Sequence, residues 1–130
     1  IIKESGTPKG SLYYHFPGGK EQLATEAVEA AGQEMAQRME EAFRLTKTPR
    51  QAIEAIIRVS AQELEASDYQ CGCPIATVAL EVATTAGPVR DACQRVFVEA
   101  QQMLTRNLTA AGFATEHAQN LAELMVTTYE

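Results

Sequence analysis

The stretch TPKGSLYYHF at residues 7–16, followed by PGGK at residues 17–20, decides how the rest of the chain is interpreted. Thr7 is typical of a helix N-cap, where its hydroxyl accepts a backbone N–H of the first turn. Pro8 suits the first helical position, where no N–H is needed. Pro17 and the glycine pair behind it are typical of a helix end. The stretch therefore predicts a short helix with a marked start and a marked stop.

Two kinds of side chain fall on opposite faces of this predicted helix. Leu12 and Phe16 are four residues apart and share one face, since successive residues are about 100° apart. On or beside the opposite face lie small and polar residues, Gly10, Ser11, Tyr13 and Tyr14, flanked by Lys9, His15 and Lys20. Hydroxyl, ammonium and imidazole groups donate to phosphate oxygens, so this face suits contact with DNA. A short aromatic helix that only covers a core shows the same periodicity, and the pattern leaves both interpretations open.

The residues before the short helix add a second element. Residues 1–5 are typical of a helix end, and Gly6 stands where a left-handed residue is favoured. A helix, a short turn with glycine and a second helix form the helix-turn-helix arrangement, in which the second helix enters the major groove. Its first residues, Lys9, Gly10 and Ser11, would then lead toward the DNA, with glycine allowing a close approach.

The stretch IIKESGTPKGSLYYHFPGGKEQL at residues 1–23 resembles the DNA-binding signature of the tetracycline-repressor (TetR) family. That signature is Ser/Ala-Gly, a short helix with Gly/Thr-Ser/Thr-Leu-Tyr-x-His-Phe, and Lys-Glu-x-Leu opening a long helix. The resemblance implies binding to a double-stranded DNA operator. The implied DNA-contacting residues are Thr7, Lys9, Gly10, Ser11, Tyr13, Tyr14, His15 and Lys20.

A long helix is predicted at about residues 20–45, directly behind the glycine pair. Its free N–H groups and its dipole can hold a phosphate, with Lys20 as a charge beside them. A plain linker turn with a solvated lysine fits the same residues. One continuous helix that spans both parts of the chain is a rigid lever, which the resemblance assigns to the transmission of ligand binding.

Four more helices are predicted in the body from apolar residues at helical spacing. Their ranges are about 49–67, 74–86, 88–111 and 115–130. Thr48 and Thr115 are predicted N-caps, and Pro49 takes the first turn of its helix. No strand is predicted. The fold class is therefore all-α, with a partial helix-turn-helix domain at residues 1–30 and a helical ligand-binding and dimerisation domain at residues 31–130.

Composition and charge agree with DNA contact at one end. The net charge is −6, and residues 1–20 hold three lysines and one glutamate, so the remaining chain carries −8. A basic tip on an acidic body suits a protein that meets DNA at that tip. No run approaches the ~18 apolar residues of a membrane span, and an odd number of cysteines argues against a disulfide framework and favours a cytoplasmic setting. Because the chain starts at Ile1 inside the implied second helix and stops at Glu130 inside an amphipathic run, we expect a longer protein.

The pair Cys71 and Cys73 lies in a predicted loop, with Cys93 further along. A zinc site, a redox-active pair and ordinary thiols are all possible, but tetrahedral zinc needs two more ligands, so no metal or cofactor is predicted. The stretch GCPIATVALE at residues 72–81 resembles the C-terminal domain of the LmrA/YxaF-like branch of the TetR family. No catalytic constellation is apparent, and the chain is predicted not to be an enzyme.

The resemblance implies a ligand-responsive repressor that forms a homodimer, here through residues 88–111 and 115–130. A small apolar effector would bind in the body and release the operator. Large side chains expected on inward faces are candidates for the pocket: Met39, Phe43, Ile57, Tyr69, Ile75, Val78 and Phe97. Plain core packing is the alternative for each of them. A helical interaction protein and a thiol-based redox sensor on the same scaffold are the competing functions.

Overall fold

The chain folds into helices joined by short turns and loops, with no strand in the described part, and this confirms the all-α prediction. The computed structural model describes residues 6 and 8–129. The helices are α2 (Lys9–His15), α3 (Gly19–Leu45), α4 (Pro49–Ala66), α5 (Pro74–Val82), α6 (Pro88–Ala110) and α7 (Thr115–Tyr129). No helix of this part is both long and apolar enough to cross a bilayer.

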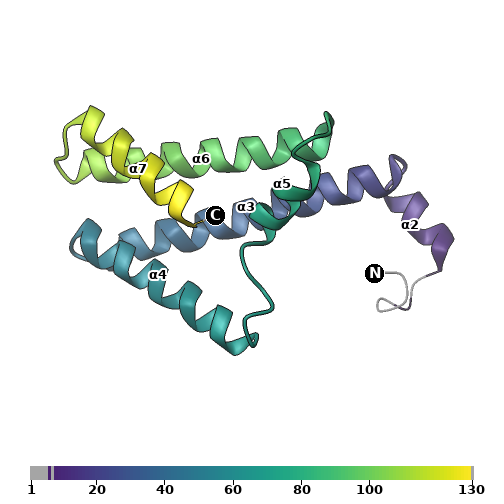
Figure 1. Cartoon of the computed structure of the whole chain (residues 1–130), viewed down its shortest axis with the longest axis horizontal. Helices are drawn as coiled ribbons and strands as arrows, with labels where there is room; N and C mark the ends of the chain where they lie inside the picture. The colour runs from purple at the N-terminus through teal and green to yellow at the C-terminus, as the bar shows by residue number, and fades with distance from the viewer. Residues whose placement is uncertain (1–5, 7, 130) are drawn as a thin grey trace.

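The long helix α3 runs along most of the molecule, and α6 lies beside it (Figure 1). Helices α4 and α5 also pack against α3, while α7 packs against α6. The short helix α2 lies at one end, beyond the start of α3 and away from α4 and α7 (Figure 1). The predicted lever is therefore a single helix that reaches from the turn after α2 to the far end of the body.

The apolar core consists of two clusters arranged along α3 and α6. The first, near the middle of α3, contains Val28, Ile75, Ala92, Cys93 and Val96. The second, toward the far end, contains Met39, Met103, Leu104 and Ala122. Met35 packs against both clusters and joins them. No charged or polar side chain is buried in the described residues, so helix packing depends on apolar contact rather than on buried ion pairs.

The helices α3 and α6 are in close contact at Gly32. A Cβ atom built on Gly32 would overlap Cγ2 of Val96 and lie 2.9 Å from its Cγ1. Both residues are buried. The absence of a side chain at Gly32 therefore sets the distance between the two longest helices.

Helix starts agree with the sequence at one predicted cap and differ at two other positions. The Thr48 hydroxyl accepts the N–H of Gln51 at 3.3 Å, which confirms this cap. Thr115 is the first residue of α7 rather than its cap, because the carbonyl of Ala114 already accepts the N–H of Ala118. Pro8 is the N-cap of α2 and not its first helical residue, since its ψ of 142° is extended.

Candidate nucleic-acid interface

Backbone hydrogen bonds define both ends of α2. The carbonyl of Pro8 accepts the N–H of Ser11 at 2.9 Å at the start. At the end, the N–H of Phe16 donates to Leu12 at 2.8 Å, and the N–H of Gly19 donates to Phe16 at 2.8 Å. Gly19 has a φ of 71°, a left-handed conformation that favours glycine and turns the chain into α3. The predicted cap residue Thr7 lies outside the described residues.

The side chains of α2 divide into an exposed face and a half-buried face. Tyr14 is 82% exposed and Tyr13 is 50% exposed. His15 is exposed as well, and its ring meets that of Tyr14 edge to face, with centroids 5.1 Å apart. Leu12 and Phe16 are half-buried, as their spacing predicted. The exposed face therefore carries two phenol hydroxyls and one imidazole that can donate to a phosphate.

Gly10 leaves the backbone exposed in the first turn of α2. Among the described residues, no atom lies within 4 Å of a Cβ atom built there. The first turn of α2 contains no acidic residue, so no carboxylate of that turn repels a phosphate. Lys9 begins this helix, and Ser11 behind it is half-buried. These features allow the helix to approach a polyanion closely.

The turn between α2 and α3 is bound by a side chain of α3, that of Gln22, which the sequence analysis did not single out. The Gly18 N–H donates to Oε1 of Gln22 at 2.8 Å. Nε2 of the same Gln22 donates to Oε1 of Glu26 at 2.7 Å. The sequence could have indicated this contact, because Gln22 follows Gly18 by four residues. A side chain in the first turn of a helix can reach back to a backbone N–H at the helix start. Lys20 is exposed in the same first turn of α3, beside Glu21.

Two of the seven predicted pocket residues do not face inward. Ile57 is 59% exposed on α4, because Ala52 and Ile56 occupy the side of that helix that packs, about 100° away from Ile57. Tyr69 is 70% exposed in the loop after α4. The inward orientation expected for both is therefore wrong in this chain.

The other five predicted pocket residues belong to the packed core. Three of them, Ile75, Val78 and Phe97, lie in or against the first cluster. The remaining two, Met39 and Phe43, lie in or against the second. The structure thus separates the predicted set into two groups instead of gathering it around one cavity.

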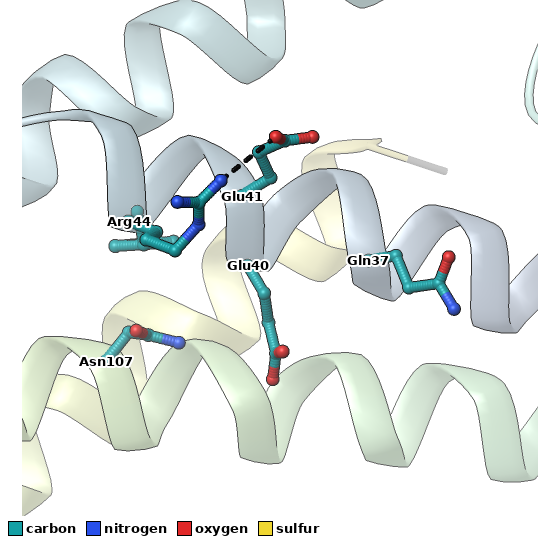
Figure 2. Close-up of a pocket in the computed structure, with 6 residues that line it drawn as sticks. Gln37, Glu40, Glu41, Arg44 and Asn107 are labelled. Carbon is teal, nitrogen blue, oxygen red and sulfur yellow. Dashed lines mark hydrogen bonds and ion pairs between the residues drawn. The ribbon is translucent and has the colours of Figure 1, made fainter.

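A hollow of about 530 Å³ opens between the second half of α3 and α6. Phe43 is the one predicted pocket residue that lines it, and the other lining residues are polar: Gln37, Glu40, Glu41, Arg44 and Asn107. Figure 2 shows Glu40 directed from α3 toward α6, and Arg44 bonded to Glu41 at 3.2 Å. The hollow is open to solvent and five of its six lining residues are polar, unlike the apolar site that the sequence predicted.

The three cysteines differ in exposure. Cys71 is exposed, and Cys73 is half-buried against the first cluster. Cys93 is buried in that cluster, and loss of solvent raises the pKa of its thiol above the ordinary value. A protonated thiol is a poor nucleophile, so redox chemistry would depend on the Cys71 loop. No group of three or more potential metal ligands is found among the described residues.

Comparisons with known proteins point to one class. The family model described as "Transcriptional regulator LmrA/YxaF-like, C-terminal domain" matches residues 49–130. The HTH-type transcriptional regulator YxaF of Bacillus subtilis is 37% identical over 125 residues, covering 96% of this chain and 65% of YxaF. The HTH-type transcriptional regulator LmrA of the same organism is 34% identical over 96% of this chain and 66% of LmrA. The HTH-type regulator Rv0196 of Mycobacterium tuberculosis is 33% identical over 100% of this chain and 68% of its own length. The chain spans about two thirds of the length of each relative.

Proposed function

This chain belongs to the LmrA/YxaF-like branch of the TetR family of helix-turn-helix transcriptional regulators, and from that membership we propose that it acts in a ligand-responsive repressor. The observation that carries the proposal is that α2, which lies at one end of the molecule (Figure 1), exposes the side chains of one of its faces. There the hydroxyls of Tyr13 and Tyr14 are free to meet a partner without disturbing the core. In this proposal the protein works in the cytoplasm.

In the proposed complex α2 enters the major groove of the operator. Its first residues, Lys9, Gly10 and Ser11, face the base edges, because a recognition helix leads with its N-terminal end. The aromatic side chains, Tyr13, Tyr14 and His15, contact flanking phosphates, together with Thr7 and Lys20. The acidic body points away from the duplex, and this charge distribution favours approach by the α2 end.

A footprint on the DNA upstream of the protein's own gene tests this function. The full-length protein should protect two half-sites about one helical turn apart, as expected for a dimeric helix-turn-helix protein. A scrambled duplex of equal length and composition is the control. Equal binding to both duplexes, or binding to neither, would contradict a sequence-specific regulator.

Replacing Lys20 with alanine is expected to weaken binding to operator and scrambled DNA by the same factor. Lys20 is exposed in the first turn of α3, where its ammonium group can neutralise one phosphate. Loss of one such contact lowers the slope of log K against log salt concentration by about one unit. Titrations at several salt concentrations measure this slope. A change in sequence preference with an unchanged slope would instead place Lys20 against a base.

We propose that a small apolar effector binds in the helical body, as membership of this family implies. Ile57 on α4 is one apolar side chain there that no other described helix covers, since it is 59% exposed while Ile56 packs against the second cluster. A ligand that favours the wrong spacing of the DNA-binding ends by ~3 kcal/mol would weaken operator binding roughly 150-fold. Mass spectrometry of small molecules released from the purified, denatured full-length protein would identify it.

The redox alternative depends on Cys71, which is the exposed thiol of the described cysteines. Treatment with peroxide separates it from the effector mechanism. Complete release of DNA by peroxide that is abolished by Cys71→Ser would favour a redox sensor. Binding that is unaffected by peroxide would favour the effector mechanism.

Dimerisation is assigned to α6 and α7, and replacing Leu124 with glutamate is expected to weaken it. Leu124 is 62% exposed on α7, so the new carboxylate costs the core little but would be buried unpaired in a dimer. A buried charge without a partner costs about 3–5 kcal/mol. We therefore expect the dimer dissociation constant of the full-length protein to rise at least about 100-fold. Sedimentation at a series of concentrations measures it.

The matched control is Leu80→Glu on α5, where the leucine is 80% exposed and lies outside α6 and α7. It should leave the dimer intact. Equal dissociation by both variants, or by neither, would contradict this interface.

A further inference from the structure

We propose that Gln22 is a positioning residue for DNA binding, which holds the turn between α2 and α3 in one conformation. The proposal rests on the proposed function of α2 and explains how that short helix keeps its direction. The residues involved are Gly18, which is the N-cap of α3, and Gly19, Gln22 and Glu26 in the first part of α3.

Both the oxygen and the nitrogen of the Gln22 side-chain amide form hydrogen bonds, and only one orientation of the amide group satisfies both partners. A backbone N–H, that of Gly18, needs an acceptor and meets Oε1 at 2.8 Å. A carboxylate, that of Glu26, needs a donor and meets Nε2 at 2.7 Å. If the amide were flipped, the N–H would face the NH₂ group and the carboxylate would face the oxygen. The side chain is therefore held by both partners at once.

Gly18 leaves room for this contact because it has no side chain. A Cβ atom on Gly18 would lie 3.0 Å from Cβ and 3.1 Å from Oε1 of Gln22, closer than ordinary contact. The next residue, Gly19, supplies the positive φ of 71° and donates its N–H to the carbonyl of Phe16. Two adjacent glycines thus have separate roles, since one makes room for the glutamine and the other turns the chain.

These bonds form a continuous connection from the last turn of α2 into α3. The carbonyl of Leu12 accepts the N–H of Phe16, and the carbonyl of Phe16 accepts the N–H of Gly19. The side chain of Gln22 then holds the intervening Gly18 and is itself held by Glu26. An operator read by α2 requires that this helix keep its angle to α3.

Helix–helix packing is weaker at α2 than elsewhere in the described part of the chain. The extensive contacts there pair α3 with α4, α5 and α6, and α6 with α5 and α7, and none of them involves α2. The exposed face of α2 must also stay free for a partner. The turn therefore fixes the direction of α2 relative to α3, and Gln22 is the side chain that holds this turn.

Replacing Gln22 with alanine in the full-length protein tests the proposal. We expect the affinity for a duplex from the gene's own upstream region to fall about three- to tenfold, the effect of one or two exposed hydrogen bonds. Hydrogen exchange of the Gly18 amide should accelerate by a similar factor. The midpoint of thermal unfolding should stay at the wild-type value, because the bonds lie outside both core clusters.

Two variants serve as comparisons. Gln33→Ala makes the same change at an exposed position of the same helix, and it should leave DNA affinity and Gly18 exchange unchanged. Glu26→Ala removes one of the two bonds and should give a smaller loss than Gln22→Ala.

The outcomes separate this proposal from the proposed function. Wild-type protein that binds no duplex would contradict the function, while the exchange rate of Gly18 would still decide whether Gln22 holds the turn. An unchanged exchange rate in Gln22→Ala would overturn the proposal. So would faster exchange with full DNA affinity, or a loss of affinity that only follows a lower unfolding midpoint.

Discussion

Replacing Gly32 with alanine is expected to lower the free energy of unfolding by about 2 kcal/mol. In an open helix the same change would raise it by up to about 1 kcal/mol, because alanine favours the helix. At Gly32 the new Cβ would overlap Cγ2 of Val96 across the α3–α6 contact. Overpacking of this kind costs typically about 1–3 kcal/mol. A cost at the upper end of that range, less the gain of up to about 1 kcal/mol from helix propensity, leaves the net loss of about 2 kcal/mol.

The cost should be high because Val96 has little freedom to move aside. A valine in a helix has one strongly preferred side-chain rotamer, and Val96 is buried within the first cluster. Urea unfolding of the full-length protein measures the effect. The double variant Gly32→Ala with Val96→Ala should be less destabilised than the sum of the two single variants, since the second change removes both clashing methyl groups. Strict additivity would contradict the clash.

Replacing Gly10 with glutamate is expected to weaken operator binding at least about 100-fold. A carboxylate near 4 Å from a phosphate costs about 4 kcal/mol at the effective dielectric of a protein surface. The fold should tolerate the change, because a Cβ atom at Gly10 meets nothing within 4 Å. The first turn of α2 also lacks an acidic residue, so the new charge has no like neighbour there. Operator titration together with thermal unfolding measures both effects.

Gly10→Gln and Gly10→Ala separate charge from size. Glutamine has the volume of glutamate without its charge, so the difference between these variants measures repulsion by phosphate. Alanine adds only a methyl group and should change which sequences are preferred, if the backbone approaches the bases there. Full affinity and unchanged preference in Gly10→Ala would contradict close approach, and full affinity in Gly10→Glu would place the operator elsewhere on the protein.

Local chemistry was enough to predict most helices of this chain. Proline at the start of α4, α5 and α6 and apolar residues at helical spacing placed the starts of those helices correctly. The ends of α4 and α6 were also close, but α5 ends at Val82 and not at about residue 86 as predicted. The threonine caps were less reliable, since Thr48 caps α4 while Thr115 lies inside α7. A cap is decided by which carbonyl first accepts a helical N–H, and neighbouring residues of similar chemistry compete for that place.

The candidate interface was also accessible from the sequence, because α2 is short and its residues are local. Spacing alone separated the half-buried Leu12 and Phe16 from the exposed Tyr14. Gln22 was missed because its role depends on the direction of the turn before α3, which its own residue type does not reveal. DNA contact by these residues stays a prediction.

The sequence by itself determined where the helices lie, which family the chain resembles and which face of α2 is open. These properties depend on neighbours within a few positions along the chain. Only the tertiary structure decided that Ile56 is packed while Ile57 is exposed, and that Gly32 must lack a side chain. Periodicity defines an apolar face, but how much of that face is covered depends on the distance and direction of the helix that packs against it.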